Sequence, residues 1–362
     1  MMDVQFLVSV RCMTYNQAAY IEDALNGFVM QQTSFPFVCF IIDDSSTDSE
    51  QNVICRYLEQ NFDLSNKSVV RNEVTDDYVM KFARHKDNKN CYFAVFYLKY
   101  NHYSSQQLKY KKLQYIEELE KQVKYIAICE GDDYWIDPYK LQKQVDLLRN
   151  DIRVSMCCNK TARFSMKQNE IIGYISASEE DCILSPHDVV MNSGGYIATC
   201  SMLIKASIIT DNYPEYCKNC HVGDYPLQIM CAMKGKISYL SDIMSVYRCE
   251  NPLSWCGRFY SDKLTDIRLR GLSSEIKMLS GFSNDYLEFK GLFEKRIRDI
   301  IIKNVPIKKD NPEDYFKYSL YFKHEIDNFG IIIKCLYLIY ASPLRKILRT
   351  SRNFLYQCIK MR

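Results

Sequence analysis

The feature that most constrains this fold is the alternation of strand and helix signals along its first half. Residues 4–10 form a short apolar run, residues 17–32 have helical periodicity, and residues 37–42 are again apolar and rich in strand-forming side chains. A second helix is expected over residues 49–60, and a further strand over residues 124–129. Such alternation predicts an α/β fold in which helices cover a mostly parallel, Rossmann-like sheet.

Two acidic clusters follow strands of this predicted sheet directly. Asp43 and Asp44 open a polar turn after the second strand, and Glu130, Asp132 and Asp133 follow the strand that ends at Cys129. In open α/β sheets, ligands bind at the carboxyl ends of the strands, where the loops converge. The placement of these carboxylates therefore predicts a site at that edge of the sheet.

The cluster at Glu130, Asp132 and Asp133 places three carboxylates within four residues, held in a turn by Gly131. Like-charge repulsion makes this costly unless a cation or solvent relieves it. Mn²⁺ or Mg²⁺ bound by one or two carboxylates usually completes its shell with water and phosphate oxygens, so a metal here suggests a nucleotide diphosphate. The alternative is a solvated acidic turn that caps the next helix.

The cluster that starts at Asp43 also has two interpretations. It can be a polar turn that caps the following helix, which is the common use of such residues. Alternatively, one carboxylate accepts the imide N–H of uracil while the end of the first strand, Met13, Thr14 and Tyr15, packs against the base.

The remainder of the chain is less regular. A helix follows Asp137 and Pro138, strands are expected over residues 153–158, 196–204 and 236–240, and a helix over residues 224–234 ends at Gly235. Residues 76–110 lack periodicity and predict a loop beside the nucleotide site. Beyond residue 255 the signal is mainly helical, which predicts two parts, residues 1–255 and residues 256–362.

Charge and cysteine usage limit the partners and the cellular location that we expect. The net charge of +3 and the absence of a compact basic cluster in the first three hundred residues argue against nucleic acid as a partner. Residues 328–362 hold seven lysines or arginines and no acidic residue, in an amphipathic pattern. This tail suits the surface of an anionic membrane, and it equally suits a helix packed on the rest of the protein. The 16 cysteines lie within apolar runs, and no secretory signal is recognisable, so we expect a cytoplasmic protein, at the inner face of the plasma membrane if the tail binds lipid.

Three motifs in order along the chain resemble glycosyltransferase family 2. They are Met13-Thr14-Tyr15-Asn16, then Ile42-Asp43-Asp44-Ser45-Ser46-Thr47-Asp48, and then Cys129-Glu130-Gly131-Asp132-Asp133-Tyr134-Trp135. The last motif, followed by Asp137 and Pro138, is similar to the bacterial branch that builds surface polysaccharides. The resemblance covers about the first 250 residues and implies the GT-A fold of nucleotide-diphospho-sugar transferases.

The resemblance implies a role for each matching residue. Met13, Thr14 and Tyr15 would line the nucleobase pocket, and Asp44 or Asp43 would bind uracil. Asp132 would be the principal metal-linked carboxylate, and Glu130 and Asp133 would flank the ribose and the diphosphate. Glu130 stands where many members have Asp, which favours a contact with ribose or with a metal-bound water.

The resemblance also implies a catalytic base. An inverting transferase needs a base for the acceptor hydroxyl, and the family places an Asp at a helix start late in the domain, which here is Asp224. The alternative for Asp224 is a helix cap. Arg248 and Trp255 match a segment near the diphosphate or the acceptor.

The predicted function is an inverting, metal-dependent glycosyltransferase that moves a sugar from a nucleotide-diphospho-sugar, UDP-linked, to a glycan or lipid-linked acceptor. The alternative is a catalytically inactive sugar-nucleotide or polysaccharide-binding protein of the same fold. A nicotinamide-dependent oxidoreductase is disfavoured because residues 11–17 contain no glycine for a phosphate-binding turn. Cys217, Cys220 and His221 match a C-x-x-C-H haem motif, but no export signal accompanies it and no second cysteine pair completes a zinc site, so the match is attributed to chance.

Overall fold

The computed structural model describes most of the chain up to residue 328 and isolated positions after it. The described residues are 4–105, 108, 111–250, 265–306, 308, 310–328, 334, 337, 338 and 340–342. The chain forms two compact units, one made of Met1–Pro214 with Asp224–Asn251, the other of Glu215–Gly223 with Pro252–Arg362. The predicted boundary at residue 255, Trp255 and nearly all of the basic tail lie outside the described residues.

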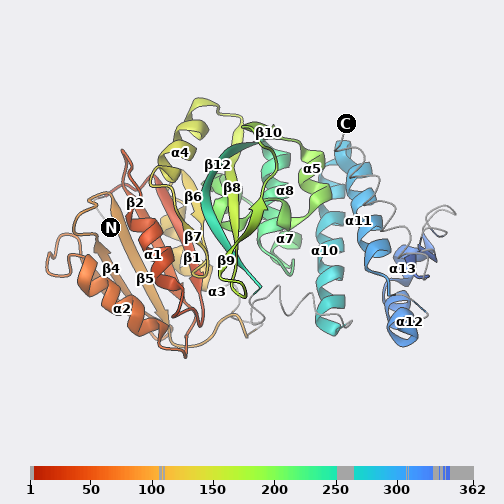
Figure 1. The fold of residues 1–362 in the computed structure, drawn as a ribbon, viewed down its shortest axis with the longest axis horizontal. Coiled ribbons are helices and arrows are strands. Elements are labelled where there is room, and N and C mark those ends of the chain that lie inside the picture. The colour runs from red at the N-terminus through yellow and green to blue at the C-terminus, as the bar shows by residue number, and fades with distance from the viewer. Residues whose placement is uncertain are drawn as a thin grey trace. The chain divides into compact units, whose positions relative to one another are not determined.

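The first unit is built on one large sheet (Figure 1). Its strands are β1 (Val8–Thr14), β2 (Phe37–Asp43), β3 (Arg71–Val74), β4 (Tyr78–Arg84), β5 (Cys91–Leu98), β6 (Tyr125–Ile128), β7 (Tyr134–Trp135), β8 (Val154–Ser165), β9 (Glu170–Ile175), β10 (Cys182–Leu184), β11 (Leu203–Lys205) and β12 (Lys236–Cys249). The main path runs β10-β12-β8-β11-β6-β1-β2-β5-β4-β3, with β7 paired to β12 and β9 to β8.

The centre of this sheet is parallel, as expected from the sequence. Strands β6, β1, β2 and β5 run in the same direction side by side, and β8 and β12 also pair in parallel. The other pairings are antiparallel, among them β11 against β6 and β4 against β5. The α/β class and the parallel central sheet are therefore confirmed.

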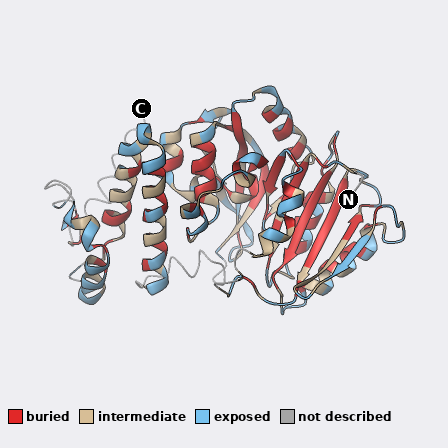
Figure 2. Cartoon of the chain, turned by 180° about the vertical axis from the view of Figure 1, so that it is seen from behind, coloured by how far each residue is buried: buried red, intermediate tan, exposed pale blue. Residues whose placement is uncertain are grey.

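Helices cover both faces of the sheet. Those of the first unit are α1 (Ile21–Val29), α2 (Glu50–Asn61), α3 (Lys111–Glu120), α4 (Lys140–Asn150), α5 (Pro186–Asn192), α6 (Ala206–Thr210) and α8 (Asp224–Lys234), with short 3₁₀ turns η1 (Gly194–Tyr196) and η2 (Thr199–Ser201). Alternate residues of β2 enter different cores. Phe37, Cys39 and Ile41 pack with α1, α2 and α4, whereas Val38, Phe40 and Ile42 pack with α3. Figure 2 shows these strands buried between helices whose outer faces are exposed.

Two sequence predictions about elements are wrong. Residues 76–110 do not form one loop, because they contain β4 and the buried strand β5. Residues 196–204 are mostly turns, since Ser201 N donates to Ala198 O at 3.0 Å and Met202 N to Thr199 O at 3.2 Å, which closes the chain locally before β11 begins. Their apolar side chains are buried, but their backbone bonds are not those of a strand.

The second unit is helical in its described part. It contains α7 (Glu215–Lys218), α10 (Asp266–Asp285), η3 (Leu287–Phe289), α11 (Lys290–Asn304), α12 (Pro312–Tyr321) and α13 (Lys323–Asp327). Phe282 of α10 stacks on Phe293 of α11 with ring centroids 5.8 Å apart, and Arg296 bonds Glu275 at 3.2 Å. None of the described helices is long and apolar enough to cross a membrane.

Candidate active site

The ends of β1, β2 and β6 meet at one edge of the sheet. Because β1 lies between β2 and β6 and runs parallel to both, Thr14 pairs with Asp43 across one interface. The loops that follow are then tied together, since Asp44 N donates to Thr14 O at 3.0 Å and Gly131 N donates to Met13 O at 3.1 Å. The structure thus brings the three motifs of the sequence into contact at their backbones.

Gly131 is required by this close approach. A Cβ atom on Gly131 would lie 2.4 Å from Thr14 Oγ1 and 2.5 Å from Gln17 Oε1, which is far inside van der Waals contact. A similar approach positions the strand after the turn, because a Cβ on Gly27 of α1 would lie 2.9 Å from Trp135 N. Only glycine at these two places lets the acidic turn sit against β1 and α1.

A buried glutamate that the sequence analysis missed organises the first two loops. Glu50, at the start of α2, accepts hydrogen bonds from Gln17 N at 2.9 Å, from Ser46 Oγ at 2.8 Å and from the Thr14 hydroxyl. Burial raises its pKa. The only sequence signal for this role is that Glu50 is the first residue of the helix after the polar turn, and that position is equally typical of an ordinary helix cap.

The same loops contain three non-glycine residues in the left-handed backbone region. Asn16, Ser45 and Ser49 have φ values of 55°, 63° and 74°. Asn16 is held by Ser46 Oγ and by Thr47 N, which donates to Asn16 Oδ1 at 2.8 Å. Left-handed backbone is uncommon outside glycine and tends to concentrate in ligand-binding loops.

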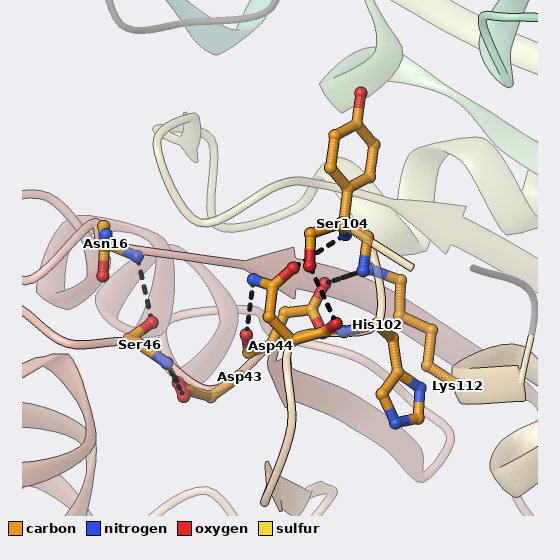
Figure 3. A network of polar contacts seen from close by, with 9 residues as sticks. Asn16, Asp43, Asp44, Ser46, His102, Ser104 and Lys112 are labelled. Carbon is orange, nitrogen blue, oxygen red and sulfur yellow. Dashed lines mark hydrogen bonds and ion pairs between the residues drawn. The ribbon is translucent and has the colours of Figure 1, made fainter. Parts of the chain in front are cut away.

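Asp43 and Asp44 are both buried and already hydrogen-bonded within the protein (Figure 3). Asp43 accepts from Ser46 N at 3.0 Å and from Gln51 Nε2 at 2.9 Å, and burial raises its pKa. Asp44 accepts from the backbone N–H of His102 at 2.6 Å and of Tyr103 at 3.0 Å. These bonds show both side chains holding loops in place, and the predicted uracil contact of either one stays a prediction.

Lys112 completes the surroundings of Asp44 and was not identified from the sequence. Its Nζ lies 2.9 Å from Asp44 Oδ2, with side chains 13% and 3% exposed, and its charge also acts on Glu130. The neighbouring His102 is fully buried, and neither ring nitrogen has a hydrogen-bond partner among the described residues. Burial lowers its pKa, so His102 is neutral near pH 7. The segment that follows β5 therefore brings one cation, the Lys112 ammonium, to the edge of the sheet, while His102 adds no charge.

The carboxylates of Glu130 and Asp132 in the acidic turn repel each other electrostatically. Glu130 keeps an exposed side chain, yet the surrounding protein reduces its hydration, and together with the charges of Asp132 and Asp224 this raises its pKa to about 8. Reduced hydration also raises the pKa of Asp132, opposed by the Arg248 charge and a hydrogen bond from Gln17.

Asp133 faces inward, away from the pair formed by Glu130 and Asp132. It is 1% exposed, it accepts a hydrogen bond from Arg248 N at 2.9 Å, and burial with the neighbouring charges raises its pKa well above the usual range. Asp133 thus links the turn to β12, which is a structural task in addition to any contact with a ligand.

Arg248 is fixed beside this turn by four groups. Its guanidinium donates to Asp132 O at 2.7 Å, pairs with the Asp23 carboxylate, and lies over the rings of Tyr134 and Tyr20 at 4.5 Å and 5.4 Å from their centroids. The side chain is only 9% exposed. The structure therefore places Arg248 beside the acidic turn and shows what holds it there, and its predicted contact with the diphosphate or the acceptor stays a prediction.

Asp224 begins helix α8 and lies close enough for its charge to act on Glu130. Asp224 Oδ1 accepts from Tyr225 N at 2.8 Å and Oδ2 accepts from the Thr199 hydroxyl at 3.4 Å. Reduced hydration raises its pKa, opposed by the Tyr225 N–H. Gly194 lies against this carboxylate, since a Cβ there would lie 3.2 Å from Oδ2. The contact with Tyr225 N–H is cap-like, and it leaves the carboxylate partly accessible.

The structure says less about the residues predicted to bind the nucleobase and about the predicted metal site. Thr14 is buried, Met13 is half-buried and Tyr15 is 45% exposed, so the Tyr15 ring is free to present a face to a ligand. In the part of the chain that the structure describes, no group of three His, Cys, Asp or Glu side chains is arranged to hold a metal. The metal role of Asp132 stays a prediction. All thirteen described cysteines are free thiols.

The chain was compared with protein families and with curated proteins. No family model matches it. Uncharacterized proteins of Mycobacterium tuberculosis (strain ATCC 25618 / H37Rv) and Mycobacterium bovis (strain ATCC BAA-935 / AF2122/97) are 25% identical over 279 residues, covering 75% of this chain and 67% of theirs. These relatives add no function.

Comparison with solved structures finds glycosyltransferases. Residues 1–349 of S. aureus TarS in complex with UDP-GlcNAc are 14% identical, with 88% of this chain and 92% of that chain covered and a TM-score of 0.46. The mannosyltransferase PcManGT from Pyrobaculum calidifontis in complex with GDP-Man and Mn²⁺ is 13% identical, with 99% and 90% covered and a TM-score of 0.47. At this level of similarity, the activity has to be inferred from the residues of this chain itself.

Proposed function

We propose that this chain is a family 2 glycosyltransferase of the GT-A fold, inverting and metal-dependent. It would transfer a sugar from a nucleotide-diphospho-sugar, UDP-linked, to a glycan or lipid-linked acceptor in cell-surface polysaccharide synthesis. The observation that carries this proposal is the position of Glu130 and Asp132 directly after the parallel strand β6, with Asp224 of α8 near enough that its charge, like that of Asp132, acts on Glu130. Such mutual repulsion is costly without a bound cation.

The residues present fit a divalent cation that is shared with a substrate. A Mg²⁺ or Mn²⁺ site of this kind needs only one or two protein carboxylates, because water and phosphate oxygens fill the remaining positions. Asp132 would hold the ion, with Glu130 beside it. When bound, the ion neutralises charge on the departing diphosphate. A cation would also remove the repulsion that raises the pKa of Glu130.

Asp224 is proposed as the base. The acceptor oxygen forms its bond to the anomeric carbon while the bond from that carbon to the diphosphate breaks, and the acceptor's proton passes to the Asp224 carboxylate. Its raised pKa makes Asp224 a better proton acceptor than an ordinary Asp, and Tyr225 N–H with the Thr199 hydroxyl holds its orientation. In-line attack from the face opposite the leaving group gives inversion.

The remaining site residues are proposed to bind the nucleotide. Tyr15, with Met13 and Thr14 behind it, would stack on the base, and Asp44 or Asp43 would accept its imide N–H through lone pairs that the protein bonds leave over. Arg248, held beside Asp132, would lie near the diphosphate, with Glu130 beside the ribose and the buried Asp133 supporting the turn from within.

Two variants test this proposal. Asp224→Asn should lower Mn²⁺-dependent turnover of the nucleotide sugar by roughly 10² to 10⁴, the usual worth of a positioned base, and leave UDP affinity unchanged. Asp132→Ala should abolish the Mn²⁺ dependence of UDP binding in calorimetry. The exposed Asp146, which bonds Gln142 on α4, offers a matched control as Asp146→Asn. Wild-type turnover in Asp224→Asn would refute the assignment of the base.

The inactive binding protein is separated by the wild-type chain itself. A panel of nucleotide sugars, with and without Mn²⁺, is screened by thermal shift, because a specific ligand raises stability by RT ln(1 + [L]/Kd). Stabilisation by one donor without any hydrolysis or transfer would favour the binding protein. Stabilisation together with slow Mn²⁺-dependent hydrolysis is the result expected for the transferase.

Peripheral membrane association through the basic tail is part of the proposal and rests on the sequence pattern alone. Co-sedimentation of the full chain with phosphatidylglycerol vesicles, compared with phosphatidylcholine vesicles, tests it. Equal co-sedimentation of the chain with both kinds of vesicle would contradict the proposed binding of the basic tail to anionic lipid.

A further inference from the structure

The helical unit contains a polar hollow that none of the motifs above accounts for. Its volume is about 480 Å³, which is within the range of small-ligand sites. The walls come from the Cys217–His221 segment with α7, from α10 and from α12. The lining includes Tyr216, Asn219, Arg270, Ser273, Lys277 and Tyr321. All of them belong to the same compact unit of the chain.

One face of α10 supplies the charge in this hollow. Arg270, Ser273, Ser274 and Lys277 are spaced i, i+3, i+4 and i+7, so they share a face of the helix. Seven residues at 1.5 Å each separate the Cα atoms of Arg270 and Lys277 by about 10 Å along the axis, so their charged groups can reach anionic groups at about that spacing. Both cations are exposed, and neither makes an ion pair with a carboxylate in the described part of the chain. The hollow therefore presents two positive groups with hydroxyls between them.

The negative groups nearby are already engaged. Asp266, which feels the Arg270 charge, pairs with Lys317 at 2.8 Å. Asp285 accepts from Tyr216 Oη at 2.6 Å. Glu215 accepts from Asn219 Nδ2 at 3.2 Å. Because no ion pair joins a carboxylate of the described residues to Arg270 or Lys277, these two charges are open to an anionic ligand.

The aromatic wall is held in one position. The Tyr216 ring lies so close to Gly281 of α10 that a Cβ there would come within 2.4 Å of the ring, and the same ring packs edge-on against Phe282 with centroids 5.1 Å apart. Tyr321, 45% exposed, adds a second aromatic side chain from α12. Gly281 thus makes room for an aromatic side chain whose hydroxyl is fixed by Asp285.

The C-x-x-C-H segment has a structural role beside this hollow. Its two cysteines are buried, and Ser274 of α10 accepts a hydrogen bond from His221 N at 3.0 Å while donating to Gly271 O at 2.8 Å. The segment is therefore tied to α10 along the face that carries the cations. This attachment fixes Asn219 at the rim, where its amide joins the polar lining.

We propose that this hollow binds an anionic glycan, a sugar chain that carries phosphate, sulfate or carboxylate groups about 10 Å apart. Arg270 and Lys277 would bind the anionic groups, Arg270 by a bidentate contact. The hydroxyl of Ser273 and the amide of Asn219 suit sugar hydroxyls, and Tyr216 and Tyr321 suit the apolar faces of sugar rings. Resting on the proposed function, the inference also names the acceptor's class, because the acceptor would then be a charged polysaccharide.

The test uses the full chain and two charge-matched double variants. Arg270→Gln/Lys277→Gln removes the cations of the hollow, and Lys290→Gln/Lys295→Gln removes two exposed cations of α11 as a control. The probes are a sulfated maltotetraose and unmodified maltotetraose, titrated by calorimetry at 0.15 M salt. We expect at least tenfold weaker binding of the sulfated probe by the first variant, less than twofold change in the control, and no measurable binding of the neutral probe.

Further arms identify the ligand class. Tyr321→Ala, an exposed change that should leave folding intact, is expected to weaken binding of the sulfated probe threefold to tenfold. Phosphatidylglycerol vesicles and inorganic phosphate are titrated in parallel. Unchanged affinity of the Arg270→Gln/Lys277→Gln variant for the sulfated probe overturns the proposal. A variant that loses binding to the vesicles but keeps its affinity for the sulfated probe also overturns it.

Failure of this inference is distinguishable from failure of the proposed function. Arg270→Gln/Lys277→Gln should keep wild-type Mn²⁺-dependent hydrolysis of the nucleotide sugar, because neither residue belongs to the acidic site. Loss of glycan binding with intact hydrolysis supports both assignments. Glycan binding by a wild-type chain that shows no hydrolysis supports the hollow and removes its role as an acceptor site.

Discussion

Substituting Gly131 probes the arrangement on which the candidate site depends. In Gly131→Ala the new Cβ would lie 2.4 Å from Thr14 Oγ1, 2.5 Å from Gln17 Oε1 and 2.8 Å from Thr14 Cβ. Thr14 cannot rotate away freely, because its hydroxyl bonds Gln17 at 2.8 Å and also bonds the buried Glu50. The acidic turn must therefore move away from β1, and the Gly131 N bond to Met13 O at 3.1 Å stretches or breaks.

The size of the effect follows from this crowding. Overpacking by one methyl group usually costs about 1 to 3 kcal/mol, and the pinned surroundings favour the upper half of that range. At about 2 to 4 °C per kcal/mol, the value for a domain of roughly this unit's size, the melting temperature should fall by roughly 4 to 12 °C. The displaced turn should also weaken UDP binding in the presence of Mn²⁺ by at least tenfold.

A matched control is available within the same unit. At Gly195 a Cβ would meet nothing within 4 Å, so Gly195→Ala should change stability by no more than about 0.5 kcal/mol. Both variants are compared by differential scanning fluorimetry and by calorimetric titration with UDP and Mn²⁺. A Gly131→Ala variant that melts within 1 °C of the wild type and binds UDP normally would refute the close approach of the turn to β1.

Three further outcomes are expected. Asp44→Asn leaves Lys112 without its buried partner and should cost about 3 kcal/mol in urea unfolding; a cost below 0.5 kcal/mol would mean that the pair is not formed. Glu120→Gln breaks the two-bond pair with Arg11, 1% and 12% exposed, and should cost about 3 to 5 kcal/mol; an unchanged urea midpoint would contradict the pairing. The pKa of Glu130 is about 8 when folded against 4.5 unfolded, so the metal-free protein binds more protons folded and loses stability as pH rises between these values. Glu130→Gln should therefore gain melting temperature relative to the wild type from about pH 5 to about pH 8, and a constant difference would contradict the shift.

The central sheet was predictable because its signals are local. An apolar strand at residues 37–42, a helix at residues 49–60 and a strand at residues 124–129 correspond to β2, α2 and β6 within a residue or two. Residues 76–110 failed because β5 is buried on both faces and so shows no alternation, while the polar segments around it obscured the short apolar run. Hydrophobic periodicity arises where one face of an element is exposed to water and the other is buried, and β5 has no such exposed face.

The candidate site was predictable only in part, for a related reason. The acidic residues at strand ends are visible in the sequence because parallel strands bring their carboxyl ends together. Glu50 and Lys112 were missed, since each acts on a residue far away in the chain, Glu50 on Thr14 and Lys112 on Asp44. No local pattern encodes such a pairing. The requirement for glycine at position 131 is likewise a property of the contact with β1 and not of the turn alone.

The hydrogen bonds of the structure divide the acidic residues into two kinds. Asp43, Asp44 and Glu50 each accept several hydrogen bonds from loop backbone or side chains, so their charges are satisfied by the protein and their removal should disturb the fold. Glu130 has no such donor among the described residues, and reduced hydration together with the charges of Asp132 and Asp224 raises its pKa. Reduced hydration raises the pKa of Asp132, although its own backbone N–H, the charge of Arg248 and a side-chain bond from Gln17 oppose this. A carboxylate that the fold leaves unsatisfied beside other carboxylates gains most from a bound cation, which is why the metal-linked part of the donor site is inferred at the acidic turn and not at the turn after β2.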